Sequence, residues 1–151
     1  MMRIAAILAL MASLATPATA HDPSVKELFE QFGLFGRWAA HCDEPARSDN
    51  PHVGITVSDA GAVREEQDLG SDFAANRYRI LSAERKSPTR LSVEVMFHAG
   101  DQAEQKQVLE FQVGNGTRRT MYNRPEGGAV RVKDGIALAV GTKTLTLKKC
   151  E

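Results

Sequence analysis

Apolar residues recur at every second position over most of the chain beyond residue 34. In segment 91–98, leucine, valine, valine and phenylalanine alternate with serine, glutamate, methionine and histidine. Shorter segments at 53–57, 109–113 and 145–147 repeat the alternation. Because successive side chains of a strand point to opposite faces, this period predicts sheets with one dry and one wet face. Such sheets are normally antiparallel, so the sequence predicts an all-β protein.

Turn-forming residues separate the alternating segments. Asn115-Gly116 and Asp134-Gly135 are pairs that accept the positive φ angles of a tight two-residue hairpin. Glycine, proline and aspartate mark further reversals between the other segments. We therefore expect strands near 35–42, 52–58, 62–68, 76–84, 89–98, 105–113, 117–124, 129–133, 136–140 and 144–149.

The chain has two cysteines, Cys42 in the first predicted strand and Cys150 just after the last. In an oxidising compartment such a pair predicts one disulfide. Closing the loop between Cys42 and Cys150 stabilises the fold by up to about 4.7 kcal/mol in the chain-entropy treatment. The first and last strands are neighbours in an up-and-down barrel, so the fold expected is an antiparallel barrel of eight to ten strands. A β-sandwich is the alternative.

Residues 1–20 have the order of a cleavable signal peptide. A basic residue precedes an apolar run at 4–14, and the segment 18–20 reads Ala-Thr-Ala, the small-residue pattern of a cleavage site. The run is shorter than the roughly 20 residues of a bilayer span, which favours cleavage over anchoring. We expect a periplasmic or secreted protein with an N-terminal helix within 21–33 and one barrel domain over 34–151.

The expected helix has recognisable ends. Asp22-Pro23 fits an N-cap followed by proline at the first helical position, and Ser24 with Glu27 offers an alternative capping box. Gly33 provides a residue that tolerates the left-handed conformation of a C-cap. The helix should therefore span about two turns ahead of the first strand.

The charge balance narrows the class of partner. The chain has 19 basic and 19 acidic residues, whereas a nucleic-acid-binding surface needs an excess of positive charge to displace counterions. No second apolar stretch reaches the length of a membrane span. The expected partners are a small apolar ligand or another protein of the cell envelope, and the sequence sets no oligomeric state.

The residues Gly36-Arg37-Trp38 follow the predicted helix and open the first strand. A helix leading into Gly-x-Trp resembles the beginning of a lipocalin or a related calycin barrel. The resemblance implies that Trp38 closes one end of the barrel beneath an arginine from a late strand, for which Arg131 is the candidate. The chain is also similar to small exported proteins of proteobacteria with an early tryptophan and cysteine and a cysteine at the very end.

The sequence contains no arrangement typical of an enzyme. It has neither a G-x-S-x-G elbow nor an H-E-x-x-H motif. His41 and Cys42 are adjacent, so on a strand they point to opposite faces and do not form a nucleophile–base pair. The histidines do not occur at metal-ligand spacings, and we expect a noncatalytic protein without a metal or another cofactor.

Two groups of residues are candidate contacts for a ligand or partner. Phe73 stands in a polar loop, where an exposed aromatic side chain can anchor a partner or plug the mouth of a barrel. Arg118, Tyr122 and Arg124 fall on one face of a regular strand. They could hold an anion or a carboxylate, but a solvated outer face is the interpretation that we favour, because charged residues are rarely buried unless paired.

These observations leave two functional hypotheses. The first is a noncatalytic, lipocalin-like binding protein of the periplasm with a small apolar ligand inside the barrel. The second is a protein-binding module, such as an inhibitor of an envelope hydrolase or an assembly factor, that acts through the loops 43–52, 69–75 and 98–104. The size of the cavity inside the barrel is the observation that separates them.

Overall fold

The computed structural model describes residues 22–151, and the predicted signal peptide at 1–20 lies outside them. Apart from one short helix, the described chain is all-β, as the alternation predicts. The elements are α1 (Val25–Gln31), β1 (Gly36–Ala39), β2 (His52–Val57), β3 (Val63–Asp68), β4 (Asn76–Ser87), β5 (Arg90–Ala99), β6 (Gln105–Gly114), β7 (Thr117–Pro125), β8 (Val132–Lys133), β9 (Ile136–Ala137), β10 (Thr142–Lys143) and β11 (Thr146–Cys150).

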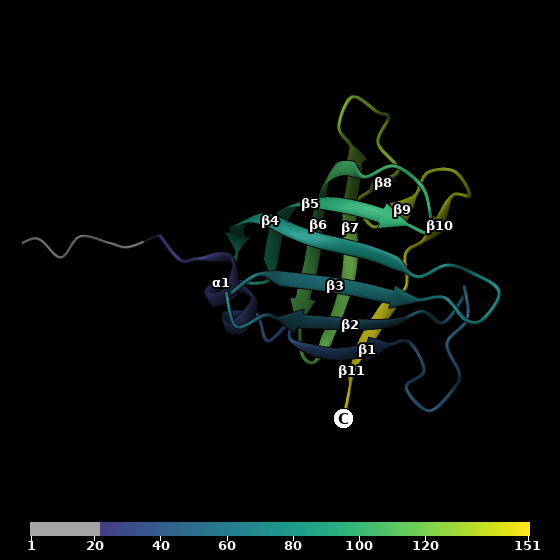
Figure 1. The fold of residues 1–151 in the computed structure, drawn as a ribbon, viewed down its shortest axis with the longest axis horizontal. Coiled ribbons are helices and arrows are strands. Elements are labelled where there is room, and N and C mark those ends of the chain that lie inside the picture. Colours follow the sequence, from purple (N-terminus) through teal and green to yellow (C-terminus); the bar gives the residue numbers. More distant parts are fainter. Residues whose placement is uncertain (1–21) are drawn as a thin grey trace, which may run out of the picture.

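Eight of the strands close into a ring. Each strand from β1 to β7 pairs antiparallel with the next, and β11 pairs with both β7 and β1. In Figure 1, β1 to β5 cross the view while β6 and β7 run steeply to them, which is how a strongly twisted sheet closes on itself. The prediction of an antiparallel up-and-down barrel is confirmed, and the structure is not the alternative sandwich.

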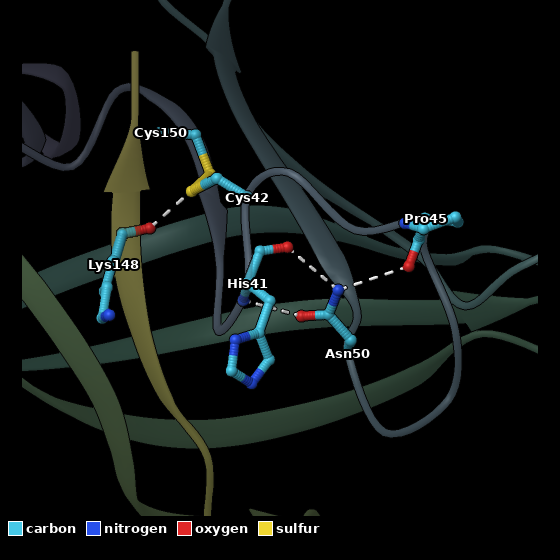
Figure 2. The surroundings of a disulfide bond; sticks show 6 residues. All are labelled: His41, Cys42, Pro45, Asn50, Lys148 and Cys150. Carbon is cyan, nitrogen blue, oxygen red and sulfur yellow. Dashed lines mark hydrogen bonds between the residues drawn. A yellow bond between two sulfur atoms is a disulfide. The ribbon is translucent and has the colours of Figure 1, made fainter.

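The predicted disulfide is present. Cys42, just after β1, is bonded to Cys150 at the end of β11, with a Cα–Cα distance of 5.6 Å. Figure 2 shows the bond beside β11, between strands that are already neighbours in the ring. The disulfide therefore joins the first and last strands of the barrel, β1 and β11, which are also paired with each other.

The helix α1 covers one end of the barrel. Ser24 is its N-cap, since the Ser24 hydroxyl accepts a hydrogen bond from the Glu27 N–H and the Glu27 carboxylate accepts one from the Ser24 N–H. The capping box, and not Asp22-Pro23, thus starts the helix. Leu28 and Phe29 are buried and join the core formed by the inward residues of the strands. No helix within residues 22–151 is long and apolar enough to span a bilayer.

Three short strands form a ribbon beside the barrel. β8, β9 and β10 have two residues each, and β8 meets the barrel at Asn123 of β7. We expected longer strands here, at 129–133 and 136–140. The turn between them is as predicted, because Asp134 and Gly135 both have positive φ angles, 52° and 73°.

Candidate functional site

A buried ion pair crosses the inside of the barrel. Glu65 on β3 and Arg118 on β7 come from opposite sides of the ring, and Arg118 Nη1 lies 2.8 Å from Glu65 Oε2. Their side chains are 4% and 3% exposed. The Arg118 guanidinium also lies over the Phe111 ring, 4.3 Å from its centroid. Each charge is tolerated inside the barrel because the other is present.

Amide side chains extend this polar interior toward the strand ends opposite α1. The amide nitrogen of Gln67 donates to Glu65 over 2.8 Å, and its oxygen accepts a bond from Asn76. On β6 and β7, Asn123 donates to Gln107 over 2.8 Å, and both side chains are buried. The polar groups thus satisfy one another, as buried polar groups must.

Tyr78 borders the same polar region. Its ring lies 5.0 Å from the ring of Phe97, centroid to centroid, on the inner face of β4 and β5. Burial, and then the nearby Glu65 carboxylate, raise the pKa of the Tyr78 hydroxyl above its ordinary value, although Arg118 and Arg131 act in the opposite direction. The hydroxyl therefore stays protonated at neutral pH.

These side chains leave little room for a ligand in the part of the interior that can be entered between β2 and β7. β1 and β11 are short, and the pairing of β7 with β11 ends at Arg119 and Thr146. A cavity of about 190 Å³ lies at this gap. Its lining includes Arg118, Gln67 and Val53. Pockets that hold a drug-sized ligand usually measure roughly 300–1,000 Å³.

The side chains of Arg118, Tyr122 and Arg124 do not share one face of β7, contrary to the prediction. A β-bulge in β7 skips Met121, so that Thr120 pairs with Phe111 while Tyr122 pairs with Glu110. The alternation shifts by one residue at that point. Arg118 therefore points into the barrel and is buried, which corrects our preference for a solvated position, whereas Tyr122 and Arg124 lie on the outer face.

Trp38 is buried as expected, but a different cation accompanies it. The indole Nε1–H donates to the Leu34 carbonyl over 2.8 Å, and the Lys149 ammonium lies 5.5 Å from the ring centroid. Lys149 also donates to the Gly33 carbonyl at the end of the helix. Arg131 instead donates to Gln105 at the other end of the barrel. The assignment of Arg131 as the partner of Trp38 is thus corrected in favour of Lys149, which β11 places directly opposite Trp38.

The loop at 40–51 is ordered around one buried asparagine. Asn50 is 1% exposed, and its side chain accepts from the His41 N–H and donates to the His41 and Pro45 carbonyls. Figure 2 shows these three bonds next to the disulfide, which holds the start of the loop. The asparagine has a structural role that turn propensity alone does not reveal.

The loop at 40–51 and the loop at 69–75 are in contact at one point and border a notch on the surface. Gly70 has a φ of +91°, and a Cβ there would lie 2.8 Å from the Ala46 carbonyl oxygen, so the two loops touch through bare backbone. The notch has a volume of about 420 Å³, and Phe73 borders it with 57% of its surface exposed. An aromatic ring at the edge of a hollow offers a large apolar contact area to a partner.

The loops at this end are acidic although the whole chain is neutral. Segments 40–51, 69–75 and 100–104 together contain six acidic residues and one arginine. That arginine, Arg47, bonds to both Glu44 and Asp49. The hydrogen bond from Arg47 is the main reason that the pKa of Asp49 is lowered, so this carboxylate stays ionised. Figure 1 shows the loops after β1 and β3 at the end of the sheet opposite α1.

The described residues do not form a metal site. Among residues 22–151, no group of histidine, cysteine, aspartate and glutamate side chains is arranged to hold a metal. Glu65 and Gln67 are not among the residues predicted from the sequence, yet both continue the inward phase of Val63 in the alternation of β3. That phase was the available signal for a polar interior.

Comparison of the chain with protein-family profiles, with curated proteins and with solved structures gives no significant match. The barrel and the site geometry are therefore the basis for the functional assignment.

Proposed function

We propose that this protein is a noncatalytic protein-binding module of the cell envelope, and that it binds its partner with the loops at the end of the barrel opposite α1. One observation carries the choice between our two hypotheses. The part of the interior that can be entered between β2 and β7 offers about 190 Å³ beside a buried ion pair, while the loop end presents a notch of about 420 Å³ and an exposed phenylalanine. A small apolar ligand fits poorly beside Glu65 and Arg118.

The loop end is suited to binding because it is already ordered. The disulfide, the buried Asn50 and the contact of Gly70 with Ala46 each fix part of the two loops at the notch, one of which carries Phe73. A surface held in its binding conformation loses less entropy when a partner docks. A disulfide is also the expected means of stabilisation for a protein exported to an oxidising compartment, which supports the periplasm or the exterior as its location.

The chemistry of the partner follows from the charges around Phe73. The three loops contain six acidic residues and one arginine, and Glu104 is also paired with Arg79 of β4. The loops keep a net negative charge, which speeds the approach of a positively charged protein. Phe73 then supplies the apolar anchor at the centre of the contact. The partner that we propose is a folded envelope protein with a basic surface.

The test is capture from an envelope extract of the producing organism on the immobilised protein and on two variants. Phe73→Ala should reduce retention of the specific partner by about tenfold or more, because truncating a central anchor costs about 2 kcal/mol. The control is Val57→Ala, which changes an exposed apolar residue at the α1 end of β2. Retention should also fall as salt screens the charges. Equal retention by all three proteins, or a partner without a basic surface, would contradict the proposal.

A further inference from the structure

We propose a second site, separate from the loop end: the cavity at the gap between β2 and β7 binds a small aliphatic carboxylate, with Arg118 as its ligand. The cavity has a volume of about 190 Å³. It is lined by Pro51, Val53, Gln67, Arg118, Arg119, Thr120, Thr144, Leu145 and Leu147. Apart from Pro51, which ends the loop at 40–51, its residues lie outside the proposed contact with a protein partner.

Arg118 has hydrogen-bond donors to spare at this cavity. A guanidinium has five N–H donors, and within the described residues the Arg118 side chain uses its Nη1 for the bond to Glu65. Within the described residues no acceptor is bonded to its Nη2 or Nε, and Arg118 is one of the residues that line the cavity. Glu65 accepts from Gln67 at its second oxygen, so both carboxylate oxygens have a donor, whereas the guanidinium has an acceptor at Nη1 alone.

The local charge favours an anion. Arg119 also lines the cavity and donates to the Thr144 hydroxyl and the Gly135 carbonyl, but among residues 22–151 it has no carboxylate within ion-pair distance. The cavity region thus has two positive charges, on Arg118 and Arg119, and one negative charge, on Glu65. A planar guanidinium binds a carboxylate through two parallel hydrogen bonds, the geometry that best fills its remaining donors.

The apolar walls and the volume of the cavity limit the chemistry and the size of the part of the ligand beyond its carboxylate. Val53, Leu145 and Leu147 provide apolar surface, which suits a short alkyl chain. The volume of the cavity is that of about six water molecules at roughly 30 Å³ each, so it holds a ligand of about six heavy atoms. Butyrate has this size, a carboxylate and a short alkyl chain. Thr120, on the inner face of β7, offers a hydroxyl to the same carboxylate.

Butyrate, inorganic phosphate and butylamine at constant ionic strength are the probes. Calorimetry on the oxidised protein should give a Kd of about 1 mM or tighter for butyrate and no measurable binding of butylamine. Butyrate should also shift the Nε–H resonance of Arg118 in a ¹⁵N correlation spectrum, whereas surface association would leave it unchanged. Substituting Arg118 itself would disturb folding, so variants around the cavity carry the test.

Leu145→Phe should fill the cavity and weaken butyrate binding by about tenfold or more, because the added volume leaves no room for the alkyl chain. Thr120→Val should weaken it less, by removing one donor. The control is Leu138→Phe, at an exposed position that does not line the cavity. Absence of butyrate binding, equal binding of phosphate or butylamine, or equal weakening by Leu138→Phe would overturn the assignment. The capture experiment with Phe73→Ala is unaffected by any of these results.

Discussion

Removing the positive charge of Arg118 should destabilise the barrel strongly. Arg118→Met leaves Glu65, 4% exposed, with the Gln67 amide and without its cation, and breaking a buried pair in this way costs about 3–5 kcal/mol. The matched control is Arg77→Met, which breaks a pair with Glu66 at 3.0 Å between β4 and β3. Those side chains are 61% and 59% exposed, so the control should cost less than about 1 kcal/mol.

The measurement is urea denaturation of both variants at neutral pH, supported by thermal unfolding. For a domain of this size, about 4 °C of Tm per kcal/mol converts the loss for Arg118→Met into a drop of about 12–20 °C. The double variant Glu65→Gln with Arg118→Met should lose less stability than the two single variants together, because neither charge is then left alone. If Arg118→Met costs no more than Arg77→Met, the ion pair does not stabilise the interior and the reasoning fails.

Three further predictions concern the loops and the disulfide. Replacing both cysteines with serine should lower the free energy of unfolding by up to about 4.7 kcal/mol in urea denaturation, and an unchanged midpoint would contradict this. Gly70→Ala should destabilise more than Gly61→Ala in the same assay, since both have positive φ but only Gly70 would push a Cβ against the Ala46 carbonyl; equal losses would show that the loops separate freely. Asn50→Leu should cost about 1–3 kcal/mol by leaving buried polar groups unpaired, and amide hydrogen exchange in 40–51 should rise; protection like that of the parent protein would refute its role.

Local information in the sequence was sufficient for the architecture. The alternation in segments such as 91–98 sets which face of a strand is dry, and a two-residue turn such as Asn115-Gly116 sets the direction of the next strand. Cys42 and Cys150 then connect the ends of the chain. Strand period, turn chemistry and disulfide pairing each depend on few residues, so the barrel and its closure were predictable.

The site depended on contacts between distant strands. The bulge at Met121 reverses the phase of β7, and the sequence of β7 alone does not show it because the bulge is defined by pairing with β6. This shift turns Arg118 inward to meet Glu65, 53 positions away in the chain. Lys149 accompanies Trp38 for the same kind of reason, since the register of β11 against β1 brings them together. The sequence by itself determined which elements form and how the barrel closes. Only the tertiary structure decided which side chains meet inside it, because those contacts depend on registers that the closed barrel sets between strands far apart in the chain.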